Sequence, residues 1–196
     1  NAHIMTAINQ RDRVAVGLSG EDAGLITAEQ RHIDLGYVGD VVEVDRRILD
    51  TLLAADFIPV ISTIGSDLDG QSYNINADTA AVILTTSSTE AAIAIAASLE
   101  AEKLIYLTDV PGVLTDVDDP STLVSRLSTA RAMGFIADGV ISGGMIPKVE
   151  ACLDAVADGV GSAHILDGRI PHVVLLELLT DAGVGTMITR ADGVTG

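Results

Sequence analysis

Residues 143–168, GGMIPKVEACLDAVADGVGSAHILDG, run from a double glycine through an amphipathic segment into a short apolar stretch. Residues 145–159 carry apolar side chains at helical spacing, with Pro147 near the start and Gly159 near the end. These residue types favour those helix positions, so the pattern predicts a helix. Residues 162–168 are typical of a strand. A helix followed by a strand is one unit of an alternating α/β fold.

The same alternation extends outward along the chain. Apolar runs predict strands at residues 14–20, 57–63, 103–109, 162–168 and 185–189. Helical periodicity predicts helices at residues 44–56, 78 to about 99, 121–140, 145–159 and 171–181. Glycine-punctuated strands at 23–28 and 32–44 predict a hairpin-like excursion. Together they predict an α/β fold with a mainly parallel sheet covered on both faces, in one domain over residues 1–196.

The composition excludes several classes of partner. The formal charge of −17 opposes binding to nucleic acid or to an anionic membrane, because their phosphates repel such a chain. No apolar run reaches the roughly 18–20 residues of a membrane span. Cys152 is the only cysteine, which excludes an internal disulfide and fits a reducing compartment. We therefore expect a cytoplasmic protein.

Polar side chains gather where the predicted strands and helices end. In an open parallel sheet, ligands bind beyond the carboxyl ends of the strands. Three clusters are expected there: Asn74, Asn76 and Asp78; Thr108 and Asp109; and the segment SGGMIPK with Lys148. Each cluster also has a purely structural interpretation. Asp78 could only cap a helix, Asp109 could only initiate a turn, and the double glycine could be a flexible connection.

The use of lysine favours a binding site over these structural interpretations. The chain has only two lysines, Lys103 and Lys148, and Lys148 lies in the first turn of a predicted helix. A cation there opposes the helix dipole, unless an anion lies in front of both. Phosphate is the obvious anion, because free N–H groups and the ammonium would face it together. Asp78 would then hold a lysine in place or organise Mg²⁺, which is an arrangement for phosphoryl transfer.

Segments along nearly the whole chain resemble the N-acetylglutamate kinases of the amino-acid kinase superfamily. The most specific are NINAD, GGMIPKVEA and TDAGVGTMI. The resemblance implies a three-layer αβα sandwich around a mainly parallel sheet. It also implies ATP with Mg²⁺ and the transfer of phosphate to the side-chain carboxylate of N-acetyl-L-glutamate in arginine biosynthesis.

The resemblance also implies roles for individual residues. Asn74, the first residue of NINAD, would bind acetylglutamate, and Asp78 would organise catalytic lysines. Lys148 would stabilise the transferring phosphoryl group. Thr108, Asp109, Gly144 and Lys148 would bind the nucleotide, and no protein-bound metal is expected. Asn76 would brace its loop.

The sequence departs from the family pattern in two places. The family's N-terminal lobe, with its two glycine-rich loops, has no counterpart here, so we expect the C-terminal, ATP-binding portion with part of the acetylglutamate site. Residues 81–100 are also longer than the family's usual helix before the AEKL segment.

An inhibitory arginine site is a further implication of the resemblance. Lys103, His164, Glu177 and Gly183 match the pattern of arginine-sensitive family members. The alternative is that His164 fills a strand end while Glu177 is a solvated helix residue. Such enzymes form homo-oligomers, dimers or hexamers, and a PII-type signalling protein is a candidate partner.

Two other functions stay open from the sequence. One is a different amino-acid kinase, acting on glutamate, aspartate, carbamate or a nucleotide. The other is a non-catalytic module that binds arginine. Binding of Mg²⁺-ATP separates a kinase portion from a pure arginine sensor.

Overall fold

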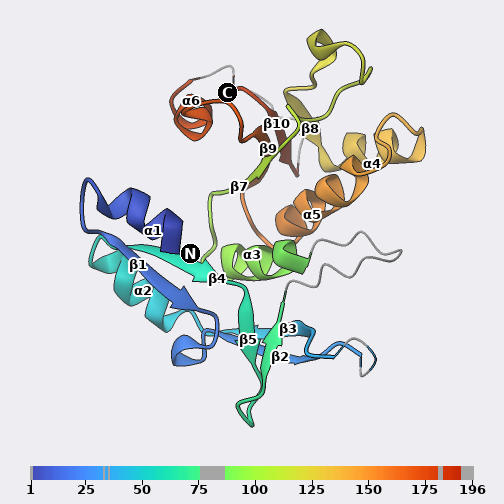
Figure 1. Ribbon diagram of the computed structural model, residues 1–196. Helices are drawn as coiled ribbons and strands as arrows, with labels where there is room; N and C mark the ends of the chain where they lie inside the picture. The colour runs from blue at the N-terminus through green and yellow to red at the C-terminus, as the bar shows by residue number, and fades with distance from the viewer. Residues whose placement is uncertain (1, 33, 35, 76–86, 181–182, 191–196) are drawn as a thin grey trace. The chain divides into compact units, whose positions relative to one another are not determined.

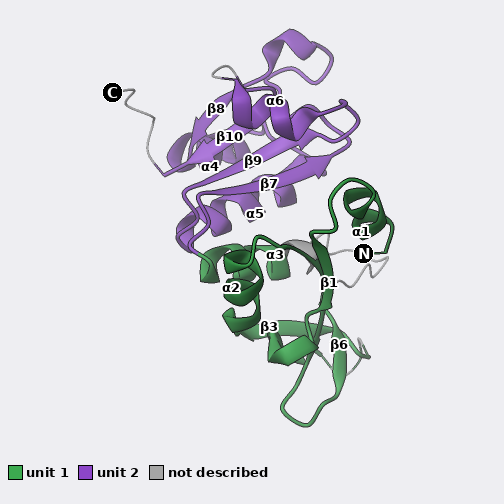
Figure 2. Cartoon of the chain, turned by 90° about the vertical axis from the view of Figure 1, so that its left-hand side faces the viewer, with its two compact units in different colours: residues 1–99 green, residues 100–196 purple. Residues whose placement is uncertain are grey.

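A computed structural model of the protein describes residues 2–32, 34, 36–75, 87–180 and 183–190. The chain divides into two compact units, residues 1–99 and residues 100–196 (Figure 2). Among the described residues, no helix combines the length and the apolar composition that crossing a lipid bilayer requires.

The first unit contains two small sheets, three α-helices and a 3-10 turn η1 (Asp22–Gly24) among its described residues. The first sheet consists of β1 (Ala15–Ser19) and β4 (Ile58–Ser62), which pair in parallel. The second sheet has the order β3-β2-β5-β6. Its strands are β2 (Ile26–Gln30), β3 (Gly39–Val44), β5 (Ile64–Ser66) and β6 (Ser72–Asn74), and the helices are α1 (Ala2–Asn9), α2 (Arg47–Ala54) and α3 (Ser87–Ser98). Side chains buried in its core include Leu25, Ile26, Leu49 and Ile75.

The second unit is a four-stranded sheet with helices on both faces (Figure 1). The strand order is β7-β9-β10-β8, with β7 parallel to β9 and β8 parallel to β10, while β9 and β10 are antiparallel. The strands are β7 (Lys103–Thr108), β8 (Arg126–Ser128), β9 (Ser162–Asp167) and β10 (Thr186–Thr189). The helices are α4 (Thr129–Ala137), α5 (Met145–Ala157) and α6 (Val173–Leu179), and a 3-10 turn η3 spans Pro120–Thr122.

Strand β9 shows why this unit has three layers. All six of its residues are buried, and side chains alternate between the two faces of a strand. His164 contacts Glu177 of α6, so Ala163 and Ile165 point to the opposite face. In Figure 1, α4 and α5 lie on that opposite side of the sheet from α6. The predicted α/β class with parallel strands and covering helices is confirmed.

The structure corrects two details of the predicted elements. The segment 121–140 was expected to be mostly helical, but Arg126–Ser128 form β8. This strand pairs with β10, a partner that is distant in the sequence. The change to helix occurs at Ser128, whose hydroxyl accepts a hydrogen bond from the Arg131 N–H at 3.3 Å and caps α4.

The polar segment after residue 63 carries no helix or strand prediction from its sequence. It forms the hairpin β5–β6, whose turn is held by Asp67, because its carboxylate accepts hydrogen bonds from the Asp69 and Gln71 N–H groups at 3.0 and 2.8 Å. Asn74 therefore ends a strand. Of the helix predicted from residue 78 to about 99, Ser87–Ser98 form α3, and the part before residue 87 lies outside the described residues.

The second correction concerns β4, a strand of the sheet that the sequence predicts to be covered on both faces. Its first residue, Ile58, is 46% exposed, and the other four are half-buried. An element not foreseen, α1, lies before β1. The Asn9 side chain holds it there, donating to the Ala15 carbonyl at 3.0 Å and accepting from the Ala15 N–H at 2.8 Å.

Candidate functional site

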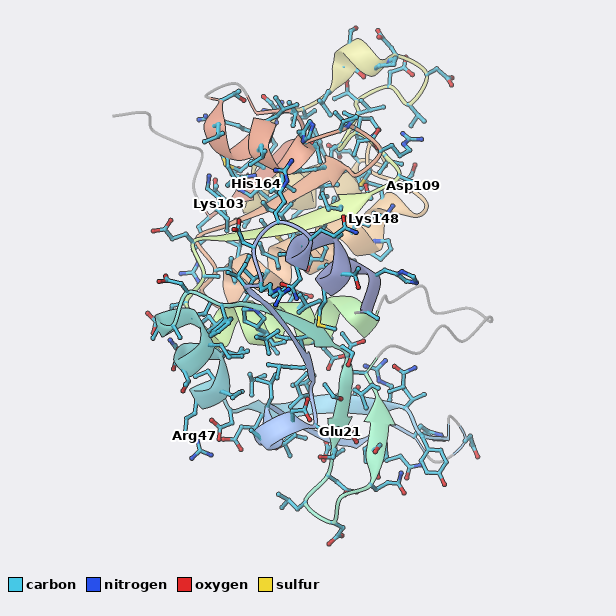
Figure 3. The ribbon with its side chains drawn as sticks, turned by 60° about the vertical axis from the view of Figure 1, so that its left-hand side comes forward. Glu21, Arg47, Lys103, Asp109, Lys148 and His164 are labelled. Carbon is cyan, nitrogen blue, oxygen red and sulfur yellow. The ribbon has the colours of Figure 1, made fainter. Side chains whose placement is uncertain are left out.

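The carboxyl end of β7 meets the beginning of α5. Lys148 Nζ lies 3.4 Å from Asp109 Oδ1, although 39 positions separate the two residues in the chain (Figure 3). The Lys148 side chain is 29% exposed and that of Asp109 is 82% exposed. The backbone N–H of Asp109 and the Lys148 ammonium hold the pKa of the Asp109 carboxyl below its usual value. The two predicted site residues thus form one exposed, charged pair.

Thr108 shapes the loop that carries Asp109. Its hydroxyl donates to the Val110 carbonyl at 3.0 Å and accepts from the Val110 N–H at 3.2 Å. The same hydroxyl lies 3.4 Å from the Leu166 carbonyl of β9. These contacts commit the Thr108 hydroxyl to the loop itself, so its structural role is to hold Asp109 at the end of the strand.

The double glycine leaves the start of α5 open. Gly144 precedes the first helical residue, Met145, and no side-chain hydrogen bond caps the helix there. A Cβ added at Gly144 would meet no heavy atom within 4 Å. The Met145 and Ile146 N–H groups donate to the Ser142 and Gly143 carbonyls at 3.3 and 3.2 Å, and Pro147 has no N–H, so the free N–H groups expected at these three positions are not found. The group that can attract an anion at this helix start is therefore the Lys148 ammonium. Lys148 extends from the first turn of the same helix, as the sequence predicts.

The carboxyl end of β9 adds a second charged pair that the sequence analysis missed. Asp167 accepts from Arg169 Nε and Nη2, each at 2.8 Å, and from the Arg169 N–H at 2.9 Å. These contacts lower the pKa of Asp167 to about 2. The signal available in the sequence was the charged Asp-Gly-Arg turn directly after a predicted strand.

The acetylglutamate cluster is described only in part. Asn74 ends β6 in the first unit, and its N–H donates to the Tyr37 carbonyl at 2.8 Å. Asn76 and Asp78 lie outside the described residues. Asn74 belongs to the first unit, whereas Lys148 and Asp109 belong to the second. The roles predicted for Asn74 and Asp78 stay predictions.

Three of the four residues predicted for arginine lie together on the α6 face of the second sheet. His164 Nδ1 lies 2.7 Å from Glu177 Oε1, and the Val184 N–H donates to Glu177 Oε2 at 2.8 Å. Gly183 has a φ of +64°, and a Cβ there would lie 3.1 Å from Glu177 Oε2. Glu177 is only 9% exposed, so the alternative of a solvated helix residue is wrong.

The fourth residue, Lys103, begins the neighbouring strand (Figure 3). It is the register partner of Ser162, whose hydroxyl lies 2.9 Å from His164 Nε2. Residues paired across parallel strands, and residues two apart along one strand, share a face. Lys103 therefore projects from the same face as His164.

Comparisons with known proteins show what the whole chain is similar to. The acetylglutamate kinase of Prochlorococcus marinus (strain MIT 9303) is 50% identical over 192 residues, which are 96% of this chain and 58% of that relative. The chain therefore spans about three fifths of that curated relative's length.

Solved structures share the fold. The protein smu.665 from Streptococcus mutans UA159 has a TM-score of 0.66 at 28% identity, covering 97% of this chain and 70% of that one. The N-acetylglutamate synthase from Neisseria gonorrhoeae, complexed with coenzyme A and L-arginine, has a TM-score of 0.70 at 27% identity, covering 89% and 38%. The profile of the amino acid kinase family matches residues 1–167, most of the chain. This chain thus belongs to the amino acid kinase family.

Proposed function

We propose that this chain is the ATP-binding part of an acetylglutamate kinase, together with part of its acetylglutamate site. The observation that carries the proposal is Lys148, placed beside Asp109 at the open start of α5 and at the carboxyl end of β7. The Prochlorococcus relative supports the choice of N-acetylglutamate as substrate, rather than glutamate, aspartate, carbamate or a nucleotide. We treat residues 1–196 as a partial amino-acid-kinase-like domain of a cytoplasmic enzyme.

In the proposed reaction, an oxygen of the substrate's side-chain carboxylate forms a bond to the γ-phosphorus of ATP. The bond from that phosphorus to the β,γ-bridging oxygen breaks, and ADP leaves with the electron pair. Such transfers need positioning and charge neutralisation but no covalent nucleophile. Lys148 neutralises charge on the phosphates, and Asp109 holds the Lys148 ammonium before ATP binds.

Magnesium belongs to this proposal as the ion that accompanies ATP. Protein sites for Mg²⁺ commonly use one or two carboxylates together with substrate phosphates. Asp109 offers an exposed carboxylate at the site. Within the described ranges, no three His, Cys, Asp or Glu side chains group together as a metal site. Bound Mg²⁺ would neutralise phosphate charge, while Lys148 and Asp109 orient the nucleotide.

The two lysines of the chain give a matched test. We expect the unsubstituted chain to bind Mg²⁺-ATP in a calorimetric titration, and Lys148→Met to bind it about tenfold more weakly, because a charge-assisted contact is lost. Lys103→Met should bind ATP normally. Equal ATP affinities for all three proteins, or no ATP binding at all, would contradict the proposal.

Turnover is tested by ADP release that depends on N-acetylglutamate. We expect little turnover from the 196-residue chain and clear turnover from a version extended to the length of the curated relatives. Turnover with glutamate or aspartate in place of N-acetylglutamate would identify a different amino acid kinase. Full turnover by the chain alone would show that the predicted missing lobe is not needed.

We further propose that arginine inhibits the enzyme by binding near Glu177, His164 and Gly183. The burial of Glu177 beside the Gly183 backbone supports an internal site for a cation, and the Neisseria synthase of similar fold was solved with L-arginine. Arginine must then share or replace the contacts of Glu177 with His164 and Val184. This coupling would move the loop at residue 184 and α6, rather than block ATP.

The same two lysine variants test this second proposal with their roles exchanged: Lys103→Met is now the test and Lys148→Met the control. Arginine should raise the melting temperature of the unsubstituted chain. The rise should be smaller for Lys103→Met and unchanged for Lys148→Met. In the extended enzyme, Glu177→Gln should weaken arginine inhibition about tenfold, with kcat nearly unchanged. No thermal shift and no inhibition at millimolar arginine would leave a kinase without this regulation. Homo-oligomer formation and a PII-type partner stay predictions.

A further inference from the structure

The Asp-Gly-Arg turn after β9 lies against the loop after β7. Thr108 and Asp167 are register partners at the ends of the two parallel strands. One residue further, the Gly168 N–H donates to the Thr108 carbonyl at 2.8 Å. Arg169 follows directly, and its positive charge acts on Asp109. The structure therefore brings Arg169 to the same edge of the sheet as Asp109 and Lys148.

Arg169 is held at its base and open at its tip. The Asp167 carboxylate, whose side chain is 11% exposed, accepts hydrogen bonds from Nε, Nη2 and the backbone N–H of Arg169. The third guanidinium nitrogen, Nη1, makes no hydrogen bond to a residue that the structure describes, and the Arg169 side chain is 67% exposed. A guanidinium fixed by one carboxylate loses less conformational freedom when it binds a second anion.

The charges at this edge show what Arg169 adds. Asp109 and Asp167 are two carboxylates, and Lys148 is the cation beside the first of them. Without Arg169 the edge would carry a net negative charge on a chain whose formal charge is −17. Such a field repels a polyphosphate. With Arg169 the charges of the four side chains sum to zero, and both the open Nη1 of Arg169 and the Lys148 ammonium are available to an incoming anion.

The local pairing alone does not make a binding site, because the chain contains it twice. Asp45 and Arg47 show the same Asp-x-Arg pattern at the start of α2 in the first unit. The Arg47 N–H donates to Asp45 Oδ1 at 3.1 Å, and Arg47 Nε donates to Asp45 Oδ2 at 2.8 Å. What distinguishes Arg169 is its position directly after β9, whose end pairs with the end of β7 that leads into Asp109, at the edge that carries Lys148.

We propose that Arg169 is a second phosphate-binding residue of the nucleotide site, positioned by Asp167 to contact the polyphosphate of ATP. The inference rests on the proposed function and extends it. Planar guanidinium groups match phosphate oxygens in a bidentate manner, whereas Lys148 supplies a point charge. In this proposal Arg169 orients the phosphate groups of ATP, and Lys148 neutralises their charge.

The test compares Arg169→Met with its matched control Arg47→Met, in calorimetric titrations of the chain with Mg²⁺-ATP and with adenosine. We expect Arg169→Met to bind ATP about five- to tenfold more weakly, with adenosine affinity unchanged, because adenosine has no phosphate. Arg47→Met should match the unsubstituted chain with both ligands. Arg169→Lys keeps the charge without the fork, so its loss of ATP affinity should be intermediate. The ATP deficit should shrink at high salt.

Each other outcome has a definite meaning. ATP affinity in Arg169→Met equal to that of the unsubstituted chain overturns the inference while the proposed function stands. An equal loss of ATP and adenosine affinity, or a loss that Arg47→Met shares, shows a structural role only and also overturns it. No ATP binding by the unsubstituted chain overturns the proposed function together with this inference.

Discussion

Alanine at Gly183 is expected to destabilise the second unit through two separate effects. The φ of +64° is a left-handed conformation, which costs an L-residue roughly 1–2 kcal/mol. The added Cβ would also lie 3.1 Å from Glu177 Oε2, which is tighter than ordinary contact. Moving that carboxylate weakens its hydrogen bonds to His164 and Val184, at about 1 kcal/mol each. We therefore expect a total loss of about 2–4 kcal/mol of unfolding free energy.

Cys152 supplies an assay that is specific for this unit. It is the only cysteine of the chain, it is fully buried in α5, and burial raises its pKa to about 12. A thiol reagent in increasing urea therefore labels Cys152 only as the second unit opens. The labelling midpoint for each variant gives the change in unfolding free energy.

Two other glycines of the same unit separate the two effects. Gly139 has a φ of +73° with no heavy atom within 4 Å of an added Cβ, so Gly139→Ala should show the conformational cost alone. Gly144 has a φ of −68° and similar open space, so Gly144→Ala should cost almost nothing. If Gly183→Ala were no more destabilising than Gly139→Ala, the close approach to Glu177 would not matter energetically.

Three further predictions follow from buried or capping contacts. Glu177→Ala should cost about 3–5 kcal/mol of unfolding free energy in the same assay, because it leaves His164 and the Val184 N–H without their buried partner. A cost below about 1 kcal/mol would be inconsistent with these contacts. Arg190→Met should cost about 1 kcal/mol, since Arg190 donates to the Val156 and Ala157 carbonyls at the end of α5; an unchanged urea midpoint would refute this. At pH 8.5, Cys152 of the native protein should react with the thiol reagent far more slowly than Cys152 of the urea-unfolded protein. The free energy of unfolding should fall as pH rises above 9, because the thiol of the unfolded chain then ionises while the buried thiol of the folded chain stays protonated. A Cys152→Ala variant with the same pH profile would contradict that account.

The sequence by itself determined the class of fold and part of the site. The alternation of apolar strands with amphipathic helices is a local pattern, and it was enough to place β7, α5 and β9 in order. The rarity of lysine, with one of the two at the start of a predicted helix, indicates by itself that Lys148 belongs to a site. These features depend on periodicity and residue chemistry, which neighbouring positions carry in full.

Only the tertiary structure decided which distant residues meet. The order β7-β9-β10-β8 differs from the order along the chain, and it turns residues 126–128 into a strand beside β10. The same packing brings Arg169 to the sheet edge that carries Asp109, and it buries Glu177 between His164 and Val184. Sequence spacing does not encode such neighbours, because the pairing of strands depends on the free energy of the whole packed sheet and its helices.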